Sequence, residues 1–180
     1  MPAGISIRKF YMFFIDTFFQ DKPAQPEPVA KPVPAAEPVA DYDPQLVAQL
    51  KADHRQLKEV FCDIGVAGKA GDLAQVQQLM GTFRSCLASH LRKEIGLFGY
   101  LEERLADDEA NLEVMHGFRR EMDQMGPVAV GMLAKYEGIS LRPRLALSLP
   151  SDLALVAGAL AGRIQREEEI LYRLYEPPMA

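Results

Sequence analysis

Residues 83–105 read FRSCLASHLRKEIGLFGYLEERL, and this stretch predicts a helix because its apolar residues recur every three or four positions. His90 and Glu94 interrupt the apolar row four residues apart, so a helix places both side chains on the same face. A buried carboxylate is costly unless another charge, a hydrogen-bond donor or a metal lies beside it. The stretch therefore predicts a polar site inside a helical core. The other members of the row are Val76, Met80, Phe83, Leu87, Leu97, Leu101 and Leu105.

Composition narrows the class of protein. The chain has 180 residues, of which 48% are hydrophobic, which is enough for one domain with a core. Its net charge is −5, and no cluster of Lys and Arg could follow a phosphate backbone, so we expect no nucleic-acid partner. The two cysteines are too few for a disulfide framework.

Residues 1–21 form an aromatic segment whose apolar run, residues 10–15, is too short to cross a bilayer. Three interpretations of residues 5–19 remain open. The segment packs onto its own domain, docks into a groove on a protein partner, or lies in a membrane interface. The scarcity of basic residues weakens the membrane interpretation. We expect a cytoplasmic protein, with peripheral attachment to a membrane as the alternative.

Residues 22–42 are predicted to be a linker. The stretch is dominated by Pro, Ala, Val, Glu and Lys, a composition that forms neither a helix nor a sheet and cannot bury a core. A polyproline-like chain of this length, at about 3.1 Å per residue, reaches roughly 70 Å. The linker would therefore hold the aromatic segment at a distance from the folded domain.

The remainder of the chain is helical in pattern, and no segment shows strand alternation. Asp43-Pro44 begins a first helix, a breaker at residues 65–71 separates it from the second, and the second runs to about Leu105. The third helix begins at residues 107–108 and should be kinked or interrupted at Gly126-Pro127. After a loop at residues 138–150, Ser151 and Asp152 open the fourth helix. These helices predict an all-α, antiparallel up-down four-helix bundle over residues 43–176, followed by a tail at 177–180.

Ionisable residues fall on the core-facing row of every predicted helix. All three histidines of the chain are among them. Facing helices of a bundle commonly bring such imidazoles and carboxylates together around iron or manganese. The competing interpretation is that each is a hydrogen-bonded core side chain. The residues are His54 on the first helix, His90 and Glu94 on the second, His116 on the third, and Arg163 and Glu167 on the fourth.

The order of these residues resembles the hemerythrin-like HHE domain. The family motif has His on helix one, His-x-x-x-Glu on helix two, His on helix three and His-x-x-x-Glu on helix four. Here Asp53-His54 matches the first element, residues 90–94 (HLRKE) the second, and His116 the third. Residues 160–172 match the surroundings of the fourth. The resemblance covers about residues 43–176 and says nothing of residues 1–42.

The resemblance implies an iron site assembled from these residues. Glu94 and Glu167 would be its bridging carboxylates. One iron would lie on the side of His54 and His90. The other would be held by His116 and by the histidine of helix four.

Arg163 stands where the family has that fourth-helix histidine. A guanidinium stays protonated and has no lone pair to give to a metal. Its planar fork could instead hydrogen-bond to Glu94 and Glu167 and replace one metal electrostatically. Oxygen-carrying members also have a helix-three histidine where this chain has Leu112. Reversible oxygen carriage is therefore not expected.

Four arrangements remain open. They are a mononuclear site on His54, His90 and Glu94, with or without Glu167; a metal-free bundle held by its polar network; a complete di-iron site; and a register in which Arg163 reaches solvent. We expect a regulatory or sensory module with a degenerate second iron position, rather than an enzyme. The alternative is a non-haem iron protein that handles oxygen, peroxide or nitric oxide, or that stores or repairs iron.

Overall fold

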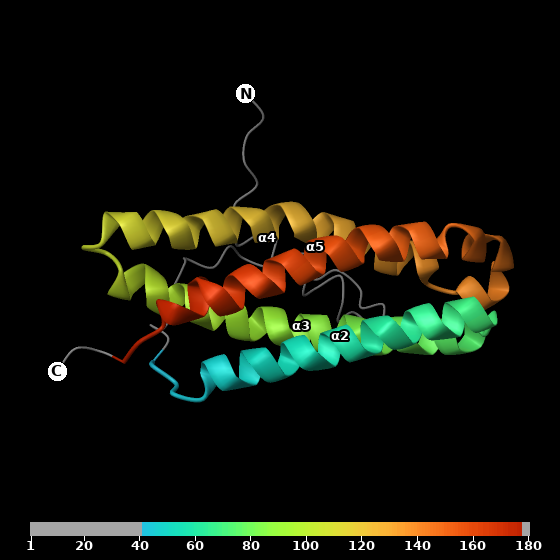
Figure 1. Cartoon of the computed structure of the whole chain (residues 1–180), viewed down its shortest axis with the longest axis horizontal. Helices are drawn as coiled ribbons and strands as arrows, with labels where there is room; N and C mark the ends of the chain where they lie inside the picture. Colours follow the sequence, from blue (N-terminus) through green and yellow to red (C-terminus); the bar gives the residue numbers. More distant parts are fainter. Residues whose placement is uncertain (1–40, 178–180) are drawn as a thin grey trace, which may run out of the picture.

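The computed structural model describes residues 41–177, which form four long α-helices lying side by side (Figure 1). With the labels of Figure 1, α2 spans Leu46–Ala70, α3 Leu73–Arg104, α4 Glu109–Tyr136 and α5 Leu149–Glu169. Successive helices run in opposite directions, and this range contains no strand. The predicted all-α four-helix bundle is confirmed.

Three short 3-10 helices complete the fold. Two of them, η1 (Ile139–Leu141) and η2 (Pro143–Leu147), connect α4 to α5 at one end of the bundle. The third, η3 (Leu171–Arg173), follows α5. Among residues 41–177, no helix is long and apolar enough to cross a membrane. The predicted aromatic segment (1–21), nearly all of the linker (22–42) and most of the tail (177–180) lie outside the described residues.

Helix ends follow local capping chemistry and differ from the predicted ends by a few residues. The carboxylate of Asp72 accepts a 2.9 Å hydrogen bond from the backbone N–H of Gln75 at the start of α3, and Asp108 accepts one of 3.1 Å from Asn111 in α4. Helix α2 continues through the predicted breaker and ends only at Gly71, whose φ of 75° is readily adopted by glycine.

Pro127 does not interrupt α4, so of the two predicted outcomes, a kink or an interruption, the interruption is wrong. Pro127 lies inside the continuous helix Glu109–Tyr136. Proline has no N–H, so the backbone carbonyl one turn earlier loses its hydrogen-bond donor. Because Pro127 is exposed, that carbonyl lies on the side of the helix open to water. The helix therefore runs the full length of the bundle.

The core of the bundle has two apolar halves with a layer of buried polar side chains between them. Leu57 belongs to one half and Leu50 to the other, and His54 lies between them on α2. The same order recurs on α3. His90 and Glu94 lie between Leu87, which packs on the first half, and Leu97, which belongs to the second. The polar layer thus crosses the bundle near the middle of its length.

Candidate metal centre

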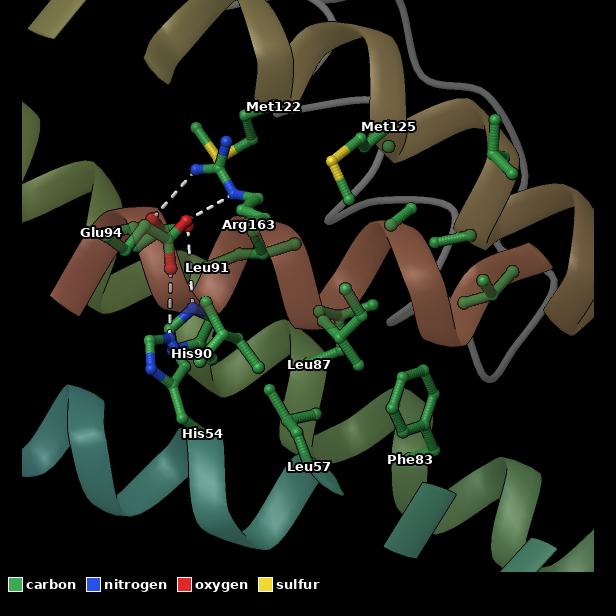
Figure 2. Close-up of a pocket in the computed structure, with 18 of the residues that line it drawn as sticks. His54, Leu57, Phe83, Leu87, His90, Leu91, Glu94, Met122, Met125 and Arg163 are labelled. Atoms are coloured by element: carbon green, nitrogen blue, oxygen red, sulfur yellow. Dashed lines mark hydrogen bonds and ion pairs between the residues drawn. The ribbon is translucent and has the colours of Figure 1, made fainter. Parts of the chain in front are cut away.

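Five buried side chains from three helices form the polar layer, which we call the His–Glu–Arg cluster (Figure 2). Each occupies a core-facing position that the helical spacing of its own segment predicted. Figure 2 shows the imidazoles of His54 and His90 below the side chain of Glu94, with the guanidinium of Arg163 above it. The members are His54 on α2, His90 and Glu94 on α3, and Arg163 and Glu167 on α5.

His54 is held by residues of α5 and η3. Its Nδ1 lies 2.8 Å from Oε1 of Glu168, and its Nε2 lies 3.1 Å from Oε2 of Glu167. The hydroxyl of Tyr172 is 3.2 Å from the same Nε2. Burial lowers the pKa of His54, and the carboxylate of Glu168 offsets only part of this effect. The ring is therefore neutral at pH 7, the state in which an imidazole can coordinate a metal.

His90 faces His54 across the cluster, with the two ring centroids 4.8 Å apart. Its Nε2 lies 3.7 Å from Oε2 of Glu94, and its Nδ1 lies 3.7 Å from Oδ2 of Asp53. Asp53 is in turn held by the ammonium of Lys93 at 2.9 and 2.7 Å. Burial raises the pKa of Asp53, but His90 and Lys93 outweigh it and keep this carboxyl ionised.

Arg163 contacts both carboxylates of the cluster. Its Nη2 donates to Oε1 of Glu94 at 3.1 Å, its Nε pairs with Oε1 of Glu167, and its Nη1 donates to the backbone carbonyl of Phe118 at 3.0 Å. Only 6% of the residue is exposed. The register in which Arg163 reaches solvent is therefore wrong, and the predicted contacts with the two carboxylates are present.

The two carboxyl groups are driven to opposite protonation states. Burial raises the pKa of Glu94, but the guanidinium of Arg163 and the imidazole of His90 outweigh burial and lower it below its ordinary value. Burial, and then the charge of Glu94, raise the pKa of Glu167 to about 9. Glu94 is thus the anion that balances Arg163, and Glu167 is neutral at pH 7 without a metal.

The cluster has the donors that one cation requires. Ligand atoms of His54, His90 and Glu167 all lie within 4.8 Å of one another. The buried Oε2 of Glu94 has no hydrogen-bond partner among the described residues, which leaves it free to accept a further contact. Two imidazoles with carboxylate oxygens suit iron, zinc or manganese. The side chains present therefore fit a single metal ion.

A comparison with protein families identifies the family of this chain. Residues 45–175 match the family described as the hemerythrin HHE cation binding domain. The chain belongs to the hemerythrin HHE family. A search of the curated proteins and a search of the solved structures found no match to this chain.

Membership in the hemerythrin HHE family implies metal binding, iron above all, and the His–Glu–Arg cluster supplies a suitable His/His/Glu group. A bound metal would also change the protonation state of Glu167. Coordination requires Glu167 to lose the proton that burial lets it keep, so metal uptake would be coupled to proton release.

His116 does not join the cluster, although the sequence and the hemerythrin motif both predicted that it would. Its side chain is 36% exposed, and its Nε2 lies 3.9 Å from Oε1 of Glu102 near the surface. Helix α4 turns Met115 and Phe118 to the core instead, and successive residues of a helix point about 100° apart. Within the described residues, α4 thus gives the cluster a backbone carbonyl and no imidazole.

Two residues of the site were not identified as such by sequence reasoning. Glu168 and Tyr172 both contact His54, and neither was among the predicted metal ligands. In a continuous helix Tyr172 would project about 140° away from Glu167. The α-helix ends at Glu169, however, and the turn into η3 brings the phenol to the imidazole. Nothing in the apolar periodicity marks this break.

Proposed function

We propose that this hemerythrin HHE domain holds one iron ion on His54, His90 and Glu167, with Glu94 and Arg163 forming a fixed ion pair beside it. The observation that carries the proposal is the buried guanidinium between the two carboxylates. A permanent cation there repels a second metal ion and occupies oxygens that a second metal would need. The site is therefore mononuclear.

A single iron bound there would supply a redox-active Lewis acid. The chain's own groups set its surroundings. Glu168 and Tyr172 fix the ring of His54, and Asp53 lies beside the outer nitrogen of His90. Because Arg163 stands in place of the fourth-helix histidine, we assign the domain a binding or regulatory role rather than oxygen carriage.

Metal analysis of the aerobically purified protein tests the proposal. We expect about one iron per chain, without the near-ultraviolet and visible bands of an oxo-bridged pair. His54→Ala and His90→Ala should lose the metal. His116→Ala is the matched control, since it removes the third histidine away from the cluster, and it should keep full iron content. Two irons per chain with oxo bands, or no uptake when Fe(II) is added anaerobically, would overturn the proposal.

The role proposed for the N-terminal segment is separate from the metal site. The linker composition and the apolar run at residues 10–15 support a segment that captures a protein partner at a distance. Deleting residues 1–21 should leave the melting temperature of the bundle unchanged while abolishing partner capture or localisation. If the shortened chain unfolds or aggregates, the segment belongs to the core instead.

A further inference from the structure

The connection between α4 and α5, residues 138–148, covers one end of the bundle (orange in Figure 1). Its two 3-10 helices, η1 and η2, lie against each other, and we call this connection the tip. Ile139 and Leu145 of the tip pack on the core. Leu141 and Leu147 are turned to solvent instead, and each is 87% exposed, the highest value among the large apolar side chains of the described chain. The tip therefore presents two leucines to its surroundings.

Contacts with the bundle hold the tip in this conformation. The hydroxyl of Ser140 donates a 2.7 Å hydrogen bond to the side chain of Gln77 on α3, and the hydroxyls of Ser148 and Tyr136 lie 3.0 Å apart. Leu149, the first residue of α5, is buried immediately after the tip. The tip is thus fixed to the core near both of its ends. The two leucines are exposed because of the fold, and such side chains are typical of a contact surface.

The tip is positively charged although the chain is acidic. Residues 138–151 contain two arginines and neither aspartate nor glutamate, whereas the whole chain has a net charge of −5. Arg144 is exposed and forms no ion pair with any described residue. The guanidinium of Arg142 donates to the backbone carbonyls of Lys135 and Glu137, which leave its charge in place.

Neighbouring carboxylates do not cancel this charge. Asp152, which follows the tip, is paired with Lys135. Asp72 lies in the turn between α2 and α3 at the same end of the bundle, where the exposed Lys69 offsets it. Beside the tip, Glu137 then remains as an exposed carboxylate against two arginines. This end of the bundle therefore keeps a net positive charge.

An anionic lipid bilayer matches this surface. Leucine side chains gain free energy when they leave water for acyl chains, and guanidinium groups beside them form charge-assisted hydrogen bonds with lipid phosphates. A second copy of the tip fits less well, because two positive surfaces repel each other. A stable protein interface buries about 800 Å² on each partner, which is more than two leucine side chains supply.

We propose that the tip attaches the domain to the surface of an anionic lipid bilayer. Leu141 and Leu147 enter the acyl boundary, and Arg142 and Arg144 lie at the level of the phosphates. Attachment is peripheral, since no helix among residues 41–177 is long and apolar enough to cross a membrane. The His–Glu–Arg cluster near the middle of the bundle stays clear of the lipid. The inference does not depend on the proposed iron site.

The first test sediments the full-length protein with lipid vesicles. We expect the wild type to bind vesicles of phosphatidylcholine mixed with phosphatidylserine, and to bind phosphatidylcholine alone more weakly. Leu141→Ser with Leu147→Ser should weaken binding to the mixed vesicles at least about tenfold, because both insertions are lost. Val114→Ser with Ile170→Ser is the matched control, since both side chains are exposed towards the opposite end of the bundle. It should bind as the wild type does.

The comparison of the two double variants isolates the tip, because residues 1–21 are present in both. Absence of binding to the mixed vesicles, or equal binding by the two double variants, would overturn the proposal. Capture of an acidic protein through the tip without vesicle binding would overturn the assignment to lipid. Circular dichroism and iron content should match the wild type in both variants, so this proposal and the metal site fail separately.

The arginines of the tip are tested by charge removal. Arg144→Gln should weaken binding to the mixed vesicles about fivefold and leave binding to phosphatidylcholine nearly unchanged, because a basic residue acts on an anionic surface through its charge. Arg173→Gln is the control, since Arg173 is an exposed residue of η3 at the opposite end, and it should have no effect. Equal effects of the two changes would contradict the placement of Arg144 at the lipid surface.

A tryptophan locates the contact, since the chain contains none. Leu147→Trp should emit at a shorter wavelength when mixed vesicles are added, and lipids brominated on their acyl chains should quench it, because tryptophan settles at the bilayer interface. Ile170→Trp should show neither change. A response from Ile170→Trp and none from Leu147→Trp would place the lipid contact elsewhere and refute the proposal.

Discussion

Nη2 of Arg163 on α5 lies 3.1 Å from Oε1 of Glu94 on α3, with 7% and 0% of the two side chains exposed. Arginine cannot give up its proton in a protein, so this contact places a permanent positive charge in the middle of an apolar bundle. Glu94 keeps its negative charge largely because Arg163 is there. The two residues are thus a matched pair, and removing one leaves the other uncompensated.

Arg163→Met should be strongly destabilising in the metal-free protein. Removing one partner of a buried ion pair typically costs about 3–5 kcal/mol, because a charge or its proton is left buried without compensation. Arg166→Met is the control, since Arg166 pairs with Glu121 at the surface. Exposed pairs contribute at most about 1 kcal/mol. Urea unfolding measures both, and equal small losses would contradict the importance of the buried pair.

Arg163→His should raise the iron content towards two per chain. The change removes the fixed positive charge and offers an imidazole lone pair beside Glu94 and Glu167. Because α4 places no histidine at the cluster, the double variant Arg163→His with Met122→His should come closer to two. Iron per chain and the oxo-bridge bands are measured together. A ratio that stays at one in both variants would mean that Arg163 does not block a second position.

Glu168→Ala should weaken metal binding about 10- to 100-fold, the usual effect of losing the hydrogen bond that orients a ligating histidine. The carboxylate of Glu168 lies 2.8 Å from Nδ1 of His54, the nitrogen that faces away from Glu167, and so orients the imidazole ring. Glu169→Ala is the control, since its side chain accepts a hydrogen bond from Gln165 at the surface and is not hydrogen-bonded to His54. Competition with a coloured chelator measures the affinity. Similar affinities for the two variants would contradict the assigned role of Glu168.

Glu167 should make the stability of the metal-free protein depend on pH. Its pKa is raised on folding from 4.5 to about 9, so over this range the folded state binds more protons than the unfolded state. The stabilising contribution is present at low pH and is lost as pH rises through the folded pKa, by at most about 1.4 kcal/mol per pH unit.

Glu167→Gln isolates that effect, because glutamine keeps the shape of the neutral acid and does not titrate. The free energy of unfolding of the wild type minus that of Glu167→Gln should fall steadily as the pH is raised from 5 to about 9. Urea titrations at each pH give the difference. A difference that stays constant with pH would show that Glu167 is ionised in the folded protein.

Sequence periodicity identified all five residues of the His–Glu–Arg cluster, because flanking apolar residues leave each helix only one face to bury. His54 lies between Leu50 and Leu57, both fully buried, so its direction follows from theirs. For α4 the pattern was ambiguous, because Met115 and His116 both fit an apolar row. Packing of Phe118 and Met122 against the other helices decides between them, and a single sequence does not contain that information.

Features that depend on where a helix stops were also missed. The position of Tyr172 follows from the end of α5 at Glu169, and no proline or glycine marks that end. The cavity beside the His–Glu–Arg cluster forms where residues of all four helices meet. Such meetings are set by how the helices pack on one another, which apolar spacing within one segment does not specify.

Because ligands on α2, α3 and α5 converge at one point, a bound cation would act as a reversible cross-link between distant parts of the chain. His54 on α2 and Glu167 on α5 are 113 positions apart in the sequence. A cation present at a hundred times its dissociation constant adds about 2.7 kcal/mol to the resistance against unfolding. Survival of the domain against proteases would then follow the cellular supply of metal.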